Sequence, residues 1–323
     1  MIVTRDPRSA GAVAALDCGT NSTRLLVASA DGDTLDREMR VTRLGQGVDT
    51  THRLAPEAIE RTVSVLRDYR RTMDENDVAR ARLVATSAAR DAENSDDFLS
   101  AAEEVTGVVP EILSGIQEGT LSFLGATADL PPARSPAGDL LTGAVELIVD
   151  IGGGSTELVA GVPGKEHDSI QVRSLDMGCV RMTERYLTSD PPTPDQLASA
   201  REAVSDELKS ARDEFDGVPP GGRVIGLAGT VSTLGSLSRG LETYKRDLVH
   251  HTVLAASDVE HWLDLLASEP ASARAKRPGM EPGRADVIVA GVLILGQVME
   301  VFGRATCLVS ESDILDGIVA SLR

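Results

Sequence analysis

Aromatic residues are scarce in this chain, because Trp, Tyr and Phe together make up only 2% of its 323 residues. Leu, Val, Ile and Ala must therefore fill the core. Cysteine is also scarce: the chain has only Cys18, Cys179 and Cys307, and no CxxC pair. This spacing argues against a structural zinc site, and an odd number without a pattern is typical of a protein from a reducing compartment.

Long apolar runs are missing as well. No segment approaches the roughly 18 uninterrupted apolar residues of a membrane span. The N-terminus, MIVTRDPRSAGAVAALD, lacks an apolar run of signal-peptide length. We therefore expect a cytoplasmic protein that has no membrane partner.

Basic residues are too few to balance the acidic ones, since 32 Lys and Arg face 50 Asp and Glu, for a net charge of −18. Binding to nucleic acid requires clustered Lys and Arg, so we expect no nucleic-acid partner. If the substrate is an anion, its attraction must come from a local basic funnel, a metal ion or backbone N–H groups.

The residues that are present predict a globular α/β chain, because 41% are apolar and the length suits two domains. Strands are expected at 13–16, 24–29, 33–41, 82–86, 111–113, 145–149, 157–161, 224–227 and 306–309. Helices are expected at 56–76, 96–105, 118–128, 194–215, 230–237, 258–266, 284–301 and 312–322, with Ser95 and Ser312 as caps. Residues 129–143 are the best linker or surface loop of the first half.

One pattern occurs twice. LDCGTNSTRLLVAS begins at Leu16 and VDIGGGSTELVAG begins at Val149, and the two segments align without a gap. The matched positions are Asp17 with Asp150, Gly19 with Gly152, Ser22 with Ser155, Thr23 with Thr156, and Leu25 with Leu158. Each segment lies between two short apolar strands, so the pattern indicates two related halves that each present one strand–turn–strand loop.

The chemistry of such a loop suits phosphate. Glycine permits close approach of a ligand, and successive backbone N–H groups form an anion-binding nest. The aspartate repels phosphate but binds Mg²⁺, which prefers oxygen ligands. A single glycine-rich hairpin is usually only a hairpin, whereas two superimposable ones favour phosphate binding. A third glycine segment, IGLAGTVSTL at 225–234, opens a helix, and it is either a further phosphate contact through Gly229 and Thr230 or a common strand-to-helix connection.

The chain resembles the exopolyphosphatase/guanosine pentaphosphate phosphohydrolase (Ppx/GppA) family, in its short two-domain actinobacterial type. The resemblance extends from about Ala14 to the C-terminus. Its specific blocks are DCGTNSTRLLV (17–27), VATSAARDAEN (84–94), ILSGIQEGTLSFLGA (112–126), IVDIGGGSTEL (148–158) and GLAGTVSTL (226–234). This chain departs from the family at Gln117, where many relatives carry a second acidic residue next to the one that matches Glu118.

The resemblance implies two ribonuclease H-like domains of the actin-like ATPase superfamily, with an active-site cleft between them. We expect the first domain at residues 1–128 and the second at 129–311, with the last helix, 312–323, as a candidate to fold back onto the first. Family analogy favours a homodimer only weakly.

The resemblance also implies release of terminal orthophosphate from inorganic polyphosphate with Mg²⁺ or Mn²⁺. Alternatives that stay open are hydrolysis of pppGpp, the stringent-response nucleotide, or of ATP and other nucleoside triphosphates, and a non-catalytic polyphosphate or alarmone sensor. A sugar kinase is disfavoured by the second and third blocks.

Glu118 matches the family's catalytic glutamate, and we expect it to orient and deprotonate the attacking water; otherwise it is a first-turn glutamate favoured by the helix dipole. Asp17 and Asp150 are expected metal ligands, directly or through water. Glu157 is expected to face the site and to assist the metal or the water. Each of these acids, taken singly, also fits an ordinary turn carboxylate.

Arg90 is the cationic candidate, because a guanidinium meets two phosphate oxygens at once. Arg24 is either a phosphate contact or a salt-bridge partner within the site. The expected phosphate donors are Asn21, Ser22, Thr86, Ser87, Gly153, Gly154, Ser155 and Thr156.

His250 and His251 are adjacent and are expected to point in different directions, so metal binding there is not predicted. Cys18 is expected to be a small core residue.

Overall fold

The structure, a computed structural model, describes residues 11–133, 140–141, 143–165, 170–215, 217–218 and 223–323. The chain packs into two compact units: unit 1 comprises Met1–Ser114 and Ile314–Arg323, and unit 2 comprises Gly115–Asp313. The sequence analysis placed the boundary after residue 128, whereas the structure places it after Ser114. The difference arises because helix α5 (Gly115–Thr127) packs on strands of unit 2.

Unit 1 is built on a five-stranded sheet in the order β3-β2-β1-β4-β5. Its strands are β1 (Val13–Cys18), β2 (Ser22–Ala28), β3 (Thr34–Val41), β4 (Arg80–Ala85) and β5 (Pro110–Ile112). The first three form the predicted antiparallel meander, and β4 and β5 extend the sheet in parallel from β1. This is the strand order of the ribonuclease H-like fold, as the resemblance implies.

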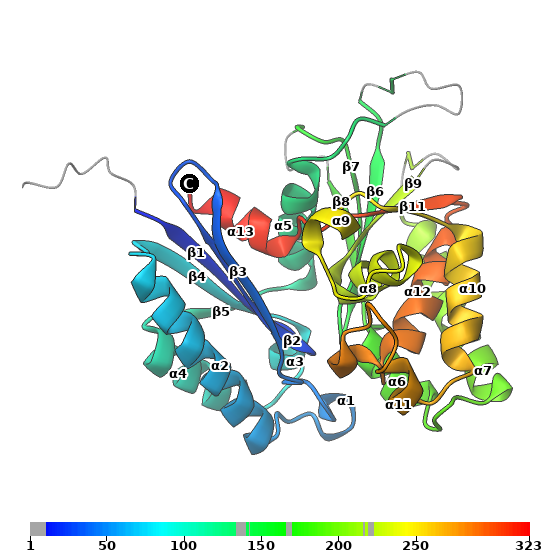
Figure 1. Ribbon diagram of the computed structural model, residues 1–323, viewed down its shortest axis with the longest axis horizontal. Helices are drawn as coiled ribbons and strands as arrows, with labels where there is room; N and C mark the ends of the chain where they lie inside the picture. The colour runs from blue at the N-terminus through cyan, green and yellow to red at the C-terminus, as the bar shows by residue number, and fades with distance from the viewer. Residues whose placement is uncertain (1–10, 134–139, 142, 166–169, 216, 219–222) are drawn as a thin grey trace, which may run out of the picture. The chain divides into compact units, whose positions relative to one another are not determined.

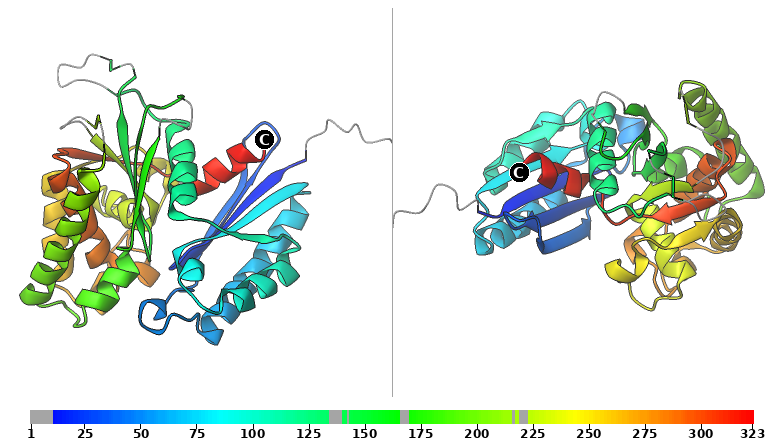
Figure 2. Two further views of the ribbon diagram at one scale, coloured as in Figure 1. Left: turned by 180° about the vertical axis from the view of Figure 1, so that it is seen from behind. Right: turned by 90° about the horizontal axis from the view of Figure 1, so that it is seen from above.

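Helices cover both faces of this sheet. They are α1 (Val48–Thr51), α2 (Pro56–Glu75), α3 (Ser87–Arg90), α4 (Ser95–Thr106) and α13 (Ile314–Ser321). Pro56 stands in the first turn of α2, where its missing N–H costs nothing. Leu16 packs in one cluster with Tyr69 of α2 and Phe98 of α4. Helix α13 lies on the other face, against β1 and β2 (Figures 1 and 2).

Unit 2 repeats this arrangement with one more strand. Its sheet has the order β10-β11-β9-β6-β7-β8. The strands are β6 (Glu146–Ile151), β7 (Thr156–Gly161), β8 (Gln171–Leu175), β9 (Arg223–Leu227), β10 (Val253–Ala255) and β11 (Thr306–Val309). Strands β6, β7 and β8 form an antiparallel meander, β9 and β11 continue in parallel from β6, and β10 closes the edge antiparallel to β11.

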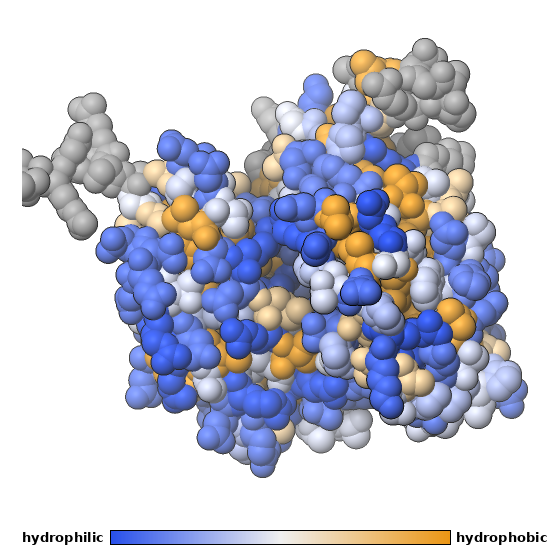
Figure 3. Space-filling view, in the orientation of Figure 1, coloured by the Kyte–Doolittle hydropathy of each residue, from blue (hydrophilic) through white to orange (hydrophobic). Residues whose placement is uncertain are grey.

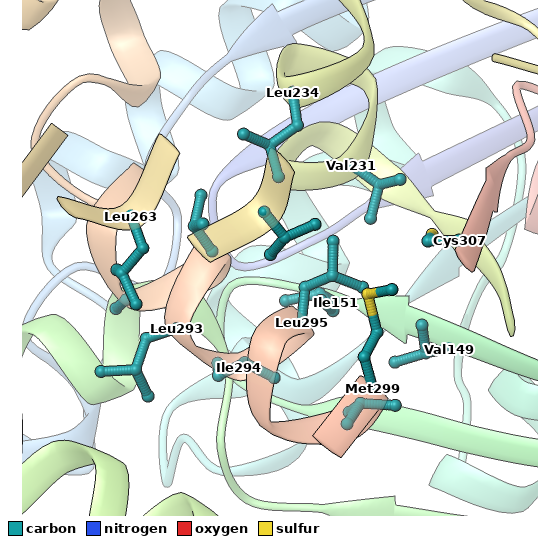
Figure 4. Packing of buried hydrophobic residues seen from close by; sticks show 14 of the residues in the cluster. Val149, Ile151, Val231, Leu234, Leu263, Leu293, Ile294, Leu295, Met299 and Cys307 are labelled. Atoms are coloured by element: carbon teal, nitrogen blue, oxygen red, sulfur yellow. The ribbon is translucent and has the colours of Figure 1, made fainter. Parts of the chain in front are cut away.

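Alternation along the unit 2 strands sends apolar side chains to both faces of the sheet. Val149 and Ile151 enter a large aliphatic core beneath helices such as α8 and α12 (Figure 4). Ile148 enters a smaller cluster with Phe123 of α5. The helices of this unit besides α5 are α6 (Cys179–Tyr186), α7 (Pro194–Arg212), α8 (Ala228–Ser238), α9 (Arg246–Val249), α10 (Ala256–Ala267), α11 (Ala271–Arg274) and α12 (Ile288–Val301).

Several predicted boundaries were wrong. Helix α12 begins at Ile288 rather than Arg284, because Pro282–Arg284 forms a separate 3₁₀ turn. Ser95 is the first helical residue of α4 rather than its cap, which is Asn94. Helix α13 begins at Ile314 rather than Ser312, and the Ser312 hydroxyl donates to Asp129 at 3.0 Å. Much of the linker expected at 129–143 lies outside the described residues.

The face of the molecule drawn in Figure 3 is largely polar. Figure 3 shows mainly hydrophilic side chains, interrupted by smaller apolar patches. Among the described residues, no helix is both long enough and apolar enough to cross a membrane.

Candidate active site

Two buried carboxylates face each other on loop 2, the turn Gly152–Ser155 with the ends of β6 and β7 that flank it. Asp150 on β6 is the register partner of Glu157 on β7. Asp150 is 7% exposed and Glu157 is 1% exposed. Like charges directly opposite each other on neighbouring strands are destabilising, so this pair suits a bound cation. Carboxylate oxygens are the ligands that Mg²⁺ and Mn²⁺ prefer, so the donor set fits such a metal.

Helix α5 lies over these two acids. Its Ser122 hydroxyl donates to Asp150 Oδ2 at 2.7 Å. A Cβ placed on Gly119 would lie 3.6 Å from the Cβ of Glu157, so the helix backbone passes close to β7 at this point. On the neighbouring strand, Ser174 donates its hydroxyl to Glu157 Oε1 at 2.7 Å. Hydroxyl donors thus hold both carboxylates in place.

Glu118 is in the first turn of α5, next to Gly119, and is half-buried. The same packing that lays α5 on β7 and β8 therefore brings Glu118 to the side of the sheet that carries Asp150 and Glu157. Gln117, where many relatives carry an acid, is exposed.

The carbonyl groups of three successive glycines of loop 2, Gly152, Gly153 and Gly154, turn toward α6. The amide of Cys179 donates to Gly152 O at 2.9 Å, and the amide of Val180 donates to Gly153 O at 2.9 Å. Arg181 Nε donates to Gly154 O at 2.8 Å. Because C=O and N–H point in opposite directions across a trans peptide, three successive amides, those of residues 153–155, face away from α6. That arrangement resembles an anion-binding nest.

The expected side-chain donors of loop 2, Ser155 and Thr156, are placed less favourably for contact with a phosphate group. Ser155 is 2% exposed, and the Thr156 hydroxyl donates to Met177 O at 2.5 Å. Gly178 packs so closely on the loop that a Cβ there would lie 2.3 Å from the carbonyl of Gly153. The role of Gly178 and α6 in shaping the loop was not foreseen from the sequence, although the glycine of DMGCVR was a visible signal.

Loop 1 is the turn Gly19–Asn21 of unit 1 with the ends of β1 and β2 that flank it. Its charges differ at the two positions that match Asp150 and Glu157. Asp17 on β1 pairs in register with Arg24 on β2. Arg24 Nη2 lies 2.6 Å from Asp17 Oδ2, and its Nε donates to the same oxygen at 2.8 Å. Of the two interpretations of Arg24, the structure has the salt bridge. Loop 1 therefore neutralises its aspartate within the protein, whereas loop 2 opposes two acids.

The remaining candidates of loop 1 are Asn21 and Ser22. Asn21 is 6% exposed, and its carbonyl accepts the amides of Thr42 and Arg43 at 3.0 and 2.9 Å. Within the described part of the chain, Asn21 Nδ2 is buried with no hydrogen-bond partner. A buried donor of this kind suits an acceptor oxygen supplied by a ligand. Ser22 begins β2 and is half-buried.

Arg90 is the last residue of the short helix α3, and Thr86 directly precedes this helix. Its Nη1 donates to the carbonyl of Leu113 at 2.9 Å, immediately before the chain enters α5. Thr86 and Ser87 are 5% and 2% exposed. The Ser87 hydroxyl donates to Asp91 at 3.4 Å, so both residues lie within the packed end of β4.

Comparison of the sequence with models of known protein families identifies the family of this chain. The family model of the Ppx/GppA phosphatases matches residues 26–322, which is most of the chain. The chain belongs to the Ppx/GppA phosphatase family. The resemblance inferred from the five sequence blocks is thereby confirmed.

Three relatives of this Ppx/GppA phosphatase match it along nearly their full length. Exopolyphosphatase 2 of Mycobacterium tuberculosis is 41% identical over 326 residues, which cover 96% of this chain and 98% of that protein. A crystal structure of an exopolyphosphatase-like protein is 37% identical, with a TM-score of 0.87 and coverage of 96% and 98%. The Ppx/GppA protein of Aquifex aeolicus is 32% identical, with a TM-score of 0.77 and coverage of 97% of both chains.

The third glycine segment of this Ppx/GppA phosphatase lies at the start of α8. Ala228 has the left-handed φ of 65°, which is unusual for a residue with a side chain. A Cβ on Gly229 would lie 1.7 Å from the Arg284 guanidinium, so this guanidinium packs directly on the glycine. Thr230 instead packs its side chain against Gly291 of α12. Arg284 was missed in the sequence analysis, since nothing near Pro282 marks it locally.

His250 and His251 contradict the expectation that their rings diverge. The rings are stacked, with centroids 3.6 Å apart, because His251 adopts a left-handed φ of 60°. With Asp129 they form a cluster of a kind that holds metals. However, His250 Nδ1 accepts the amide of Glu311 at 3.0 Å, so its Nε2 carries the proton and donates to Asp129 at 3.0 Å. That tautomer opposes coordination through Nε2. Burial and the neighbouring His250 lower the pKa of His251.

Proposed function

We propose that this chain is a cytoplasmic exopolyphosphatase that releases terminal orthophosphate from inorganic polyphosphate by attack of water. The observation that carries the proposal is the packing of α5, whose first turn contains Glu118, on the strands that carry two opposed, buried carboxylates. Membership of the Ppx/GppA phosphatases and the long match to a protein named exopolyphosphatase 2 support the choice of substrate.

In this proposal, Glu118 accepts the proton of the attacking water. Asp150 and Glu157 hold Mg²⁺ or Mn²⁺, which when bound offsets the charge of the phosphate oxygens. Asp17 would assist in holding such a metal, with its Oδ2 already held by Arg24. Removal of the Glu118 carboxylate is therefore expected to stop the chemistry without removing the phosphate contacts.

The phosphate contacts come from both loops and from two further segments. Loop 1 contributes Asn21 and Ser22, with Arg24 holding Asp17 beside them, and loop 2 contributes Gly153, Gly154, Ser155 and Thr156. Arg90, Thr86 and Ser87 provide further donors, as do Gly229 and Thr230. Buried N–H groups are already oriented, so they stabilise phosphate charge at little reorganisation cost.

The same residues would hydrolyse the terminal phosphoanhydride bond of pppGpp or ATP, so these residues alone do not determine which substrate is preferred. The net charge of −18 repels any polyanion at long range. Attraction to polyphosphate therefore depends on the local donors and on the metal. A homodimer is part of the proposal only by family analogy, and sedimentation of the purified chain tests it.

Orthophosphate release from short polyphosphate, long polyphosphate, pppGpp and ATP, each with Mg²⁺ and with Mn²⁺, tests the proposal. We expect release from polyphosphate in the presence of either metal and none with a chelator. If orthophosphate is released only from pppGpp or only from ATP, that nucleotide and not polyphosphate is the substrate. Turnover of none of the four, together with tight binding of one of them, would favour the sensor.

A further inference from the structure

Helix α5 carries three hydroxyl side chains, and they differ in what they bond. Thr120 and Thr127 each donate to the carbonyl of the residue four positions earlier, at 2.7 and 2.8 Å. This bond within the helix is the usual way for a helical hydroxyl to find an acceptor. Ser122 instead donates to Asp150 Oδ2 on strand β6, at 2.7 Å. The hydroxyl of Ser122 therefore serves a group outside its own helix.

The contact between Ser122 and Asp150 is closed to water. Ser122 is fully buried, and Asp150 is 7% exposed. A hydrogen bond from a hydroxyl to a carboxylate is charge-assisted, and a buried environment strengthens it further. Alanine has the better helix propensity and no polar group to satisfy. The packing of α5 by itself therefore gives no reason for a serine at this position.

Alternation along β6 explains why Asp150 points toward α5. The residues on either side of Asp150 enter the large core on the other face of the sheet. Ile148, two residues earlier, belongs to the apolar cluster that includes Phe123 of α5. Residues two apart on a strand share a face, so Asp150 is on the α5 side as well. This apolar cluster fixes the spacing between helix and strand, and the hydrogen bond forms within that fixed spacing.

Helix α5 also packs on the serine that holds the second acid. Ser174 of β8 donates its hydroxyl to Glu157 Oε1 at 2.7 Å. A Cβ on Gly115 would lie 2.2 Å from Ser174 Cβ, so the start of α5 packs directly on this serine. The helix thus touches the donor to Glu157 and itself provides the donor to Asp150. The orientation of both carboxylates depends on α5.

We propose that Ser122 is a positioning residue that orients the Asp150 carboxylate for a divalent cation held together with Glu157. The inference rests on the proposed function, in which these two acids hold Mg²⁺ or Mn²⁺. Hydrogen-bond partners of a metal ligand orient it and contribute to the affinity for the metal. Because the hydroxyl fixes Oδ2, the carboxylate loses less freedom when the cation binds. Ser122 therefore acts on metal affinity more than on the chemical step.

The test is a calorimetric titration of Mn²⁺ into the full chain in the absence of substrate. We expect Ser122→Ala to bind Mn²⁺ about 10–100-fold more weakly than the wild type. Ser122→Cys fills the space but has only a weak donor, so it should bind more weakly as well. Thr120→Ala is the matched control on the same helix and should bind Mn²⁺ as the wild type does. Asp150→Asn locates the site, because it should remove most of the binding.

Kinetics give a second measurement that a purely structural role would not reproduce. For Ser122→Ala, the Mn²⁺ concentration that gives half-maximal release of orthophosphate should rise about as much as the Kd. At saturating Mn²⁺, kcat should fall less than about threefold, since the chemical step itself is unchanged. Melting temperatures in EDTA report whether each variant is folded before the metal is added.

An unchanged or tighter Mn²⁺ affinity in Ser122→Ala would overturn the proposal, because the hydroxyl would then serve only the metal-free protein. Equal weakening by Thr120→Ala would also overturn it, as would a wild type whose Mn²⁺ binding is absent or does not need Asp150. If the wild type binds Mn²⁺ but releases no orthophosphate from polyphosphate, the proposed function fails instead. The titration, which needs no substrate, then still decides the role of Ser122.

Discussion

The clearest residue-scale feature is the contrast between the two loops. At matching positions, loop 1 pairs Asp17 with Arg24, and loop 2 opposes Asp150 to Glu157. The first pair is neutral within the protein and needs no ligand. The second places two carboxylates, both less than a tenth exposed, in direct opposition. Loop 2 is therefore the better candidate to hold a divalent cation, and loop 1 the better candidate to contact phosphate.

Glu118→Gln tests the assigned base. The amide keeps the shape of the side chain but cannot accept a proton from water, so kcat should fall by on the order of 10²–10⁴. Affinity for polyphosphate, measured by calorimetry, should survive. Glu202→Gln, at an exposed position of α7, is the matched control and should be as active as the wild type. A fully active Glu118→Gln would remove the residue from its role.

The cysteines should be inert in the native protein. Burial raises the pKa of Cys179 to about 11 and that of Cys307 to about 12, and burial also raises the pKa of Cys18. Since the thiolate is the reactive form, iodoacetamide at pH 8 should label none of the three before denaturation and all three afterwards. Rapid labelling of native Cys18 would show that loop 1 opens, contrary to its packing.

At the scale of elements, the position of α5 depends on its small residues. Gly115 and Gly119 let the helix backbone approach β8 and β7, and the first turn of this helix contains Glu118. A Cβ on Gly119 would lie 2.6 Å from Val172 Cγ1 and 3.1 Å from Val159 Cγ2. Contacts that short force the helix or the valines to move.

Gly119→Ala should therefore destabilise unit 2 by about 1–3 kcal/mol, despite the better helix propensity of alanine, and should lower kcat because Glu118 moves with α5. Gly296→Ala in α12 is the control, since a Cβ there would meet only Val259 Cγ1 at 3.7 Å. That variant should be about 1 kcal/mol more stable and fully active. Denaturant unfolding and steady-state kinetics measure both. Equal stabilisation by the two substitutions would disprove the packing argument.

For the whole molecule, the notable feature is that unit 1 is discontinuous in sequence. Its last helix, α13, is reached only after the whole of unit 2 has been traversed, and it covers a face of β1 and β2. The ion pair between Arg37 of β3 and Asp316 of α13, at 2.7 Å, fastens it there. Folding of unit 1 therefore needs both ends of the chain.

Ile318→Ala should selectively weaken unit 1. Ile318 is fully buried, and truncation of a buried isoleucine costs about 2–5 kcal/mol. Hydrogen exchange should accelerate in β1 and β2 and stay unchanged in β6 and β9. Leu266→Ala, at an equally buried position of α10 in unit 2, should give the reverse pattern. Acceleration of both units by both variants would indicate that they unfold together.

Local features could be predicted from the order of the residues: the repeated strand–turn–strand loops, the apolar periodicity of α2 and the family blocks. These depend on neighbours along the chain, so glycine placement and alternation suffice to find them. Four further facts became known from the folded chain: Arg24 holds Asp17, Asp150 opposes Glu157, α5 packs with unit 2, and Arg284 packs on Gly229. Those facts depend on strand register and on close packing between distant segments, which a local pattern does not encode.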